Sequence, residues 1–299
     1  MSQTTRVRSL GYPGAFEYFS SKLAPALPTT RLRQSHATIP ACGIFLQFIL
    51  PTPACHGRIF SPPKMDQLIL PDWFRGFDQL YQEPDRAANS YRRDLPHWRY
   101  AGASYFVTFR LADSLPASAL QEMREATALW ESKRTAERNA PGGQVSETTR
   151  EAHELFQKEQ FIRMEQHLDL GHGSCVLRDT AARRMAEDAI GYFQGTRCRL
   201  AAWVVMPNHI HALCHPLEGW ELEDLMASWK KHSAREINQL LGRSGPLWQP
   251  ESYDRIIRDG DHFRRVVRYI VRNPVKACLS QDEAAVWVSP GILGEAGNQ

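Results

Sequence analysis

Cysteines, long apolar runs and net charge are all scarce in this sequence. Six cysteines among 299 residues, with no Cys-x-x-Cys spacing, do not make a disulfide framework. A reducing, cytoplasmic compartment is therefore the expected location. The longest apolar run of the first third, residues 41–50, is too short to cross a bilayer, so no membrane association is expected.

Acidic residues are almost absent from residues 1–64, where Glu17 is the only one. Three interpretations stay open for this stretch: a transit peptide, a disordered tail, or sequence read through upstream of a true start at Met65. We favour the last, because the chain becomes patterned and charge-balanced directly afterwards. The expected organisation is thus an N-terminal segment 1–64, an arm 65–100, a folded domain 101–280 and a C-terminal tail 281–299.

The segment from residue 101 onward alternates between strand-like and helix-like composition. The predicted elements are strand 105–111, helices 117–138, 146–167 and 180–193, strands 199–205 and 209–214, helix 221–241, strand 253–258 and helix 262–272. Asp179 and Asp261 are the expected N-caps, and Pro274 is expected to stop the last helix just before it. This order predicts an α+β fold, a ferredoxin-like antiparallel sheet with helices packed on one face.

Two histidines, His209 and His211, stand two residues apart in an apolar run. Side chains in a strand alternate between faces, so both imidazoles point to the same side. Neutral imidazole is the commonest metal ligand of proteins, and the pair is a candidate metal site. Two ordinary histidines of a half-buried strand are the alternative.

The last predicted helix contains Tyr269 and Asn273, one turn apart and on the same face as Arg265. A tyrosine hydroxyl beside an amide and a guanidinium is a candidate nucleophile near a phosphate, although it needs a cation or a metal to activate it. The alternative is an ordinary residue on the surface of an amphipathic helix.

Basic residues gather locally although the net charge of the whole chain is only +3. Such clusters indicate a phosphate-bearing partner, or else solvated faces. The candidate DNA-binding residues are Lys230, Lys231, Arg235, Arg255, Arg258, Arg265, Arg268 and Arg272.

Several short motifs occur here in the order found in a known family. They are Leu95-Pro-His-Trp98, Tyr105-Phe-Val-Thr-Phe109, Met206-Pro-Asn-His-Ile-His211, Trp229-Lys, Gly245-Pro-Leu-Trp-Gln249, Asp254-Arg-Ile-Ile-Arg258 and Tyr269-Ile-Val-Arg-Asn-Pro-Val275. Over residues 91–280 the chain resembles the single-tyrosine HUH transposases, and among them the REP-associated tyrosine transposases.

The resemblance implies a transposase that cuts and joins single-stranded DNA. His209 and His211 would hold Mg²⁺ or Mn²⁺, with Asn273 as a third, amide ligand. Tyr269 would attack a phosphodiester, form a 5′-phosphotyrosine link and release a 3′-hydroxyl. The substrate would be hairpin DNA of palindromic repeats, and the protein a monomer or a homodimer. Ligand softness alone favours zinc or manganese over magnesium.

Two other functions remain open on the sequence. One is a domesticated relative that binds DNA hairpins without cutting them. The other is a zinc hydrolase that uses His209, His211 and His215, or a zinc site completed by Cys214 and His215. A hydrolase needs a carboxylate base near its metal, and the histidine stretch contains none.

Overall fold

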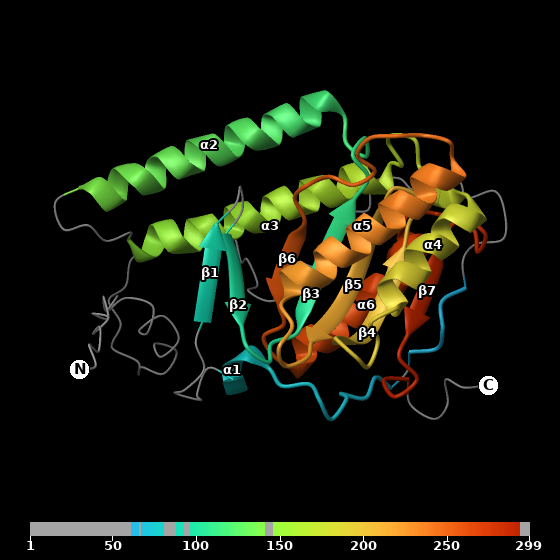
Figure 1. The fold of residues 1–299 in the computed structure, drawn as a ribbon. Helices are drawn as coiled ribbons and strands as arrows, with labels where there is room; N and C mark the ends of the chain where they lie inside the picture. The colour runs from blue at the N-terminus through green and yellow to red at the C-terminus, as the bar shows by residue number, and fades with distance from the viewer. Residues whose placement is uncertain (1–60, 66, 81–87, 93–95, 141–145, 294–299) are drawn as a thin grey trace, which may run out of the picture. The chain divides into compact units, whose positions relative to one another are not determined.

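The computed structural model describes residues 61–65, 67–80, 88–92, 96–140 and 146–293, which all belong to one of the chain's two compact units, residues 51–299. Its elements are α1 Phe77–Leu80, β1 Ala88–Arg92, β2 Pro96–Tyr100, β3 Tyr105–Arg110, α2 Ala117–Asn139, α3 Glu147–Asp169, a 3-10 turn Val176–Arg178, α4 Thr180–Gly191, β4 Cys198–Val205, β5 His209–Pro216, α5 Leu222–Leu240, β6 Tyr253–Ile256, α6 Gly260–Lys276 and β7 Ala285–Val288 (Figure 1). The N-terminal segment 1–64, for which three interpretations are open, lies outside the described residues except for residues 61–64. Within the described part, no helix combines the length and apolar character that a membrane crossing requires.

Five strands form one antiparallel sheet in the order β6-β3-β5-β4-β7. The four strands β3, β4, β5 and β6, taken in chain order as one to four, lie in the order four-one-three-two, which is the split βαβ arrangement. The predicted α+β, ferredoxin-like fold is confirmed. The fifth strand, β7, was not predicted because four residues of mixed burial leave only a weak pattern.

Helices cover both faces of the sheet, not one face as predicted (Figure 1). On one face, α4 and α5 pack through side chains such as Ile190 and Trp229 against Val205 and Ile210. On the other, α6 packs through Phe263 and Val267. The difference arises because β4 and β5 are apolar at successive positions, and a strand buried on both faces needs cover on both.

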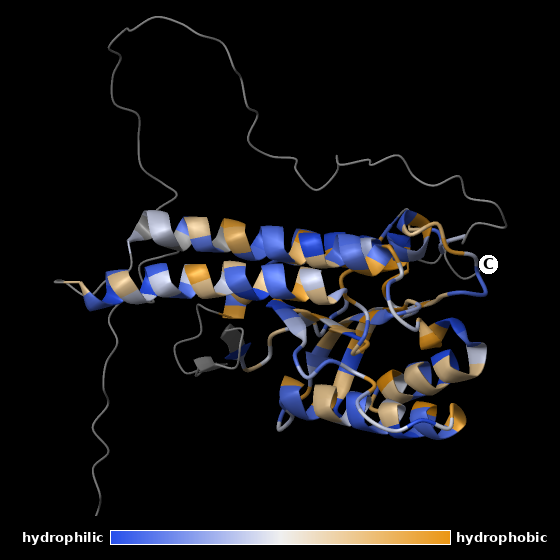
Figure 2. Cartoon of the chain, turned by 90° about the horizontal axis from the view of Figure 1, so that it is seen from above, coloured by the Kyte–Doolittle hydropathy of each residue, from blue (hydrophilic) through white to orange (hydrophobic). Residues whose placement is uncertain are grey.

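Helices α2 and α3 lie side by side and belong to the connection between β3 and α4 (Figures 1 and 2). The two ends of this long connection meet: the Asp113 carboxylate accepts a 2.8 Å hydrogen bond from the Ser174 backbone N–H. Gly173 beside it has φ +88°, and a Cβ there would lie 2.4 Å from the Asp113 carbonyl oxygen. The close approach therefore requires glycine at residue 173.

The bounds of α6 differ from the prediction at both ends. Asp259 is the N-cap and accepts a 2.6 Å hydrogen bond from the His262 N–H, whereas Asp261 lies in the first turn and pairs with Arg264. At the other end the helix continues through Pro274 to Lys276. Pro274 lies in the last turn, where it removes a single intrahelical hydrogen bond, and its ring is buried in the core. The predicted N-cap of α4, Asp179, is confirmed.

Candidate metal and tyrosine site

The two histidines lie on β5 and face the same side of the sheet, with both side chains fully buried. Each Nδ1 atom has an oxygen partner: Asn208 Oδ1 lies 2.8 Å from His209 Nδ1, and Thr108 Oγ1 lies 2.8 Å from His211 Nδ1. Such outer partners fix the ring orientation of metal-ligating histidines. The Nε2 atoms are left to face each other.

Asn208 decides which nitrogen of His209 carries the proton. Its Nδ2 donates to two backbone carbonyls, those of Leu168 and His172, each at 3.2 Å. The amide can therefore present only its oxygen to His209, whose Nδ1 must be the donor. The lone pair of His209 then lies on Nε2, the tautomer that a metal ligand needs.

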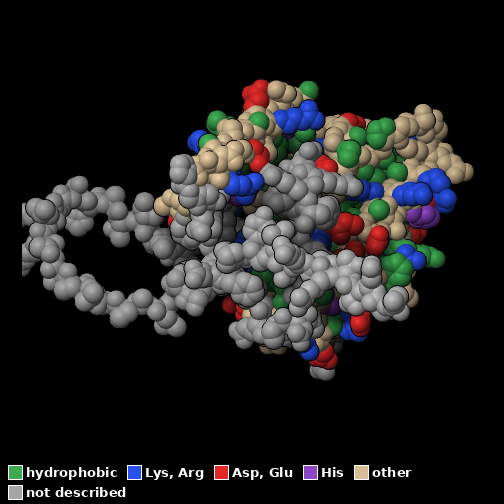
Figure 3. Space-filling model, turned by 60° about the vertical axis from the view of Figure 1, so that its left-hand side comes forward, with side chains coloured by type: hydrophobic (Ala, Val, Ile, Leu, Met, Phe, Trp, Pro, Cys, Tyr) green, Lys and Arg blue, Asp and Glu red, His purple; other side chains and the backbone are tan. Residues whose placement is uncertain are grey.

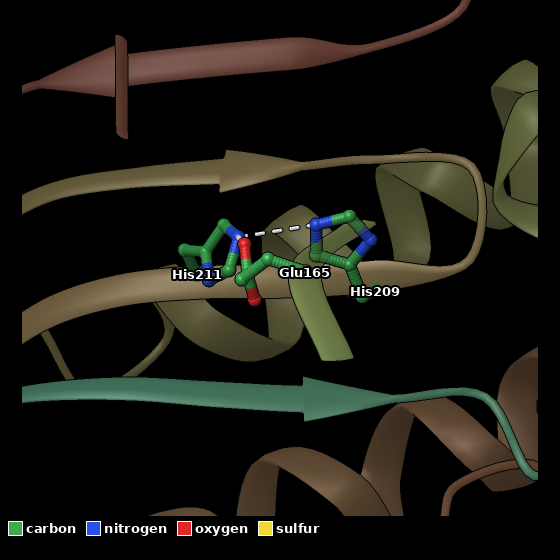
Figure 4. Close-up of side chains that lie close together, drawn as sticks. All are labelled: Glu165, His209 and His211. Atoms are coloured by element: carbon green, nitrogen blue, oxygen red, sulfur yellow. Dashed lines mark hydrogen bonds and ion pairs between the residues drawn. The ribbon is translucent and has the colours of Figure 1, made fainter. Parts of the chain in front are cut away.

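The Nε2 atoms of His209 and His211 are 3.1 Å apart, and a Glu165 carboxylate oxygen lies 3.3 Å from that of His211 (Figure 4). The ligand atoms of these three buried residues all lie within 4.8 Å of one another. Two nitrogens each about 2.1 Å from one metal ion would be separated by roughly 3.0–3.4 Å. The arrangement thus has the dimensions of a metal site.

Glu165 belongs to α3 and was not among the residues predicted from the sequence. A signal for it was present: Phe161, Met164 and Leu168 give α3 an apolar stripe, and Glu165 lies on that stripe. A carboxylate there must be paired when the helix packs, because isolated buried charges are too costly. Its partners lie 44 and more residues away, as the numbering of His209 and His211 shows, so the sequence pattern could not identify them.

Tyr269, on α6, also reaches this cluster. Its hydroxyl donates a hydrogen bond to the Glu165 carboxylate, and its ring lies 5.4 Å from that of His211, centroid to centroid. The ring of Phe106 stacks on His211 from the β3 side. The candidate nucleophile and the candidate metal ligands are therefore brought together through one carboxylate.

Electrostatics keep the three groups in defined protonation states. Burial, and then the neighbouring His211, lowers the pKa of His209 to about 3, so this imidazole is neutral at neutral pH. Burial alone would raise the pKa of Glu165, but His211, His209 and the Tyr269 hydroxyl outweigh it and hold that pKa at about 2. Burial and the charge of Glu165 raise the pKa of Tyr269 well above its usual value. The phenol is therefore protonated and needs further help to act as a nucleophile.

Asn273 lies one turn after Tyr269 on α6 and is 1% exposed. Neither its Oδ1 nor its Nδ2 has a hydrogen-bond partner in the described part of the chain, and the same holds for the second carboxylate oxygen of Glu165. Unpaired buried polar atoms are costly and call for a partner that is not a protein group. The free Glu165 oxygen, on a carboxylate beside the two imidazoles, fits a ligand of a divalent cation.

The structure does not bring Cys214 and His215 to the histidine pair. The Cys214 side chain is buried in the core on the α4–α5 side of the sheet. His215 contacts Trp73 and Ser104 instead, at the far end of β5. Neither residue joins the cluster of ligand atoms around Glu165, so a zinc site made from them is not supported.

The candidate DNA-binding residues do not share one surface. Lys230, Lys231 and Arg235 belong to α5, whereas Arg265, Arg268 and Arg272 belong to α6 on the opposite face of the sheet, and Arg255 and Arg258 lie on or next to the edge strand β6. Lys230 donates to the carbonyls of Gln249 and Pro250. On the face seen in Figure 3, basic and acidic side chains are interspersed.

Three comparisons with known proteins relate the chain to transposases. Residues 174–273 match the family described as IS200-like transposases. A REP-associated tyrosine transposase of Escherichia coli (strain K12) is 33% identical over 75 residues, which are 25% of this chain and 43% of that protein. The chain thus spans less than half the length of this curated relative.

A solved structure of a REP-associated tyrosine transposase bound to a REP hairpin is 19% identical, with a TM-score of 0.35 over 71% of this chain and 98% of that one. The segment matched by the family contains His209, His211, Tyr269 and Asn273 but neither Glu165 nor helices α2 and α3. The similarity to the IS200-like transposase family is confined to residues 174–273, about a third of the chain.

Proposed function

We propose that this protein is a metal-dependent transposase that cuts and joins single-stranded DNA, with Tyr269 as its nucleophile. One observation carries the proposal: the Tyr269 hydroxyl bonds to the Glu165 carboxylate, which also lies beside the His211 Nε2 that faces His209. An ordinary tyrosine on the surface of a helix does not require metal ligands nearby. A tyrosine that attacks a metal-bound phosphate must lie next to them.

In the proposed reaction, the Tyr269 oxygen attacks the phosphorus of a phosphodiester. The new bond is a 5′-phosphotyrosine link, the bond from phosphorus to the 3′ oxygen breaks, and that oxygen leaves as a 3′-hydroxyl after taking a proton from solvent. Glu165 accepts the hydrogen bond of the phenol before attack and is placed to receive its proton. Reversal with another 3′-hydroxyl would join strands.

His209, His211 and Glu165 would hold a divalent cation, with Asn273 as a further oxygen donor. The ion would polarise the phosphate and offset the negative charge that keeps the pKa of Tyr269 high. Two nitrogen and up to two oxygen ligands suit Mn²⁺ well, and Mg²⁺ is the other ion we propose. The buried, unpaired acceptor oxygens support an oxygen-rich site.

The proposed substrate is a DNA hairpin with a single-stranded flank, of the palindromic-repeat type. Support comes from the E. coli relative, which is named a REP-associated tyrosine transposase, and from the basic residues of α5, β6 and α6. The basic residues lie on both faces, so a hairpin and its flank would follow more than one surface of the domain.

A metal hydrolase is a second candidate because of Glu165. The sequence offered no carboxylate near the histidine pair, whereas the structure places one beside His211. In that function Glu165 would activate water and Tyr269 would be dispensable. Binding of hairpins without cleavage is the third possibility.

A covalent-adduct assay separates the three functions. Purified protein is incubated with an end-labelled hairpin oligonucleotide, taken from repeats flanking the gene, with Mn²⁺ or Mg²⁺, and resolved on a denaturing gel. We expect an adduct that Tyr269→Phe and His209→Ala abolish. Cleavage without an adduct that survives Tyr269→Phe would establish the hydrolase. An adduct that survives would move the nucleophile, with Tyr253 as the next residue to test. Tight binding with neither product would establish the binding protein.

A further inference from the structure

Arg110 is the last residue of β3 and pairs directly with His209 of β5. Directly opposed residues of antiparallel strands place their side chains on the same face, with Cα atoms about 4.5–5.5 Å apart. The neighbouring pair confirms which face this is, because Thr108 pairs with His211 and bonds to its ring. The Arg110 side chain therefore lies on the face of the metal and tyrosine site.

The charge of Arg110 has no acidic partner among the described residues. Within the described part of the chain, its guanidinium donates one side-chain hydrogen bond, of 3.3 Å, to the hydroxyl of Ser114. The charged group that acts on it is another cation, Arg124 of α2. Burial, and then this neighbour, lowers the pKa of Arg110 to about 10.

A half-buried guanidinium beside a second one is unfavourable in the free protein. Arg99 on β2 shows the usual solution, with ion pairs to Asp254 and Glu223. Arg110 and Arg124 lack it, and Arg124 is exposed to solvent. Buried charges that are left uncompensated are typical of sites whose partner is a ligand. The ligand must be an anion, and planar guanidinium groups fit phosphate in particular.

We propose that Arg110, with Arg124, forms a phosphate subsite next to the metal site and binds the DNA backbone phosphate adjacent to the one that Tyr269 attacks. The proposal rests on the proposed function, since it takes single-stranded DNA as the ligand. It also answers a local repulsion, because the Glu165 carboxylate beside His211 would repel a DNA phosphate. The two arginines would offset that repulsion and fix the register of the strand.

The test is the binding of oligothymidylate in the absence of metal, where no cleavage occurs, measured by fluorescence anisotropy over a range of salt concentrations. The variants are Arg110→Gln and Arg124→Gln. The matched control is Arg138→Gln, an exposed residue of α2 that is 14 positions from Arg124, roughly four turns along the same helix.

Arg110→Gln should weaken binding by about tenfold or more, because a charge-assisted hydrogen bond is lost. The slope of log affinity against log salt should fall by about 0.7, the value for one phosphate contact on a single strand. Arg124→Gln should also weaken binding and lower the slope, whereas Arg138→Gln should change neither the affinity nor the slope. Arg110→Gln should also raise the melting temperature of the free protein, since it removes an uncompensated charge.

An unchanged affinity and slope in Arg110→Gln would overturn the subsite. Equal losses in all three variants would also overturn it, because the contribution would then be general surface charge. A lower melting temperature together with normal binding would assign Arg110 a structural role. If the unchanged protein binds Mn²⁺ but no oligothymidylate, both the proposed function and the subsite fail. This result differs from an Arg110→Gln variant that binds as well as the unchanged protein, which overturns the subsite alone.

Discussion

Tyr269 donates its hydroxyl hydrogen bond to Glu165, a residue 104 positions earlier in the chain and on a different helix. The same carboxylate lies 3.3 Å from His211 Nε2. A change at Glu165 must therefore reach both the nucleophile and the metal ligands.

Glu165→Gln should weaken Mn²⁺ binding by at least about 10- to 100-fold, the loss of metal affinity that is typical when a residue that supports a metal ligand is mutated. It removes the negative charge while it keeps the shape of the side chain. Titration calorimetry of the purified protein measures the affinity. Glu159→Gln on the same helix is the control, because Glu159 is exposed and its substitution should leave Mn²⁺ affinity unchanged. Equal affinities for both variants would remove Glu165 from the metal site.

Asn208→Ala should lower the free energy of unfolding by about 3 kcal/mol, because two backbone carbonyls and His209 lose their buried partner. Asn208→Asp should lose stability as well but retain Mn²⁺ affinity, since a carboxylate oxygen still holds the His209 Nδ1–H. Urea denaturation and calorimetry separate the two effects. Asn238→Ala breaks one bond to the Gly245 carbonyl at an exposed site and should cost much less.

Asp259→Ala should destabilise the protein by about 1 kcal/mol, the usual cost of a lost N-cap. Asp261→Ala should have almost no effect, because Asp261 is exposed and makes only an ion pair within the first turn of α6. Thermal denaturation of the two variants compares them directly. The reverse order would show that the cap lies at Asp261, as the sequence had suggested.

Stability should fall as the pH drops from about 6.5 to 4, and His262 should account for part of the loss. Burial, and then Arg255 and Arg265, lowers the pKa of His262 to about 4, and its Nδ1 accepts the Arg258 N–H. Over that interval the unfolded chain takes up a proton that the folded chain refuses, so unfolding becomes easier by about 1–3 kcal/mol.

The measurement is the free energy of unfolding as a function of pH for His262→Gln. This variant should show a shallower fall between pH 6.5 and 4, because glutamine has no proton to take up. His232→Gln, at an exposed position of α5, should keep the slope of the unchanged protein. An identical slope in all three proteins would exclude His262 as the source.

Features with short-range patterns could be predicted from the sequence. Alternation placed His209 and His211 on one face of a strand, and helical spacing placed Tyr269 and Asn273 on one face of a helix. Both placements depend only on the geometry of a single element. The order of strands followed because few topologies connect these elements without crossing.

Features that depend on packing between distant segments could not be predicted. Glu165 and Arg110 gain their significance from neighbours on other elements, and no local pattern records those neighbours. The continuation of α6 through Pro274 also depends on packing against distant segments. The rule that a helix stops before proline concerns local sterics, and burial of the Pro274 ring in the core outweighs it in the last turn.

The meeting of Asp113 and Ser174 means that residues 114–173 leave the sheet and return to the same place. The two ends of the excursion are close enough that a short bridge between them would keep the connection from β3 to α4. The excursion nevertheless supplies Glu165 to the shared site. Excision would therefore remove Glu165 from the site together with the Leu168 and His172 carbonyls that orient Asn208 beside His209.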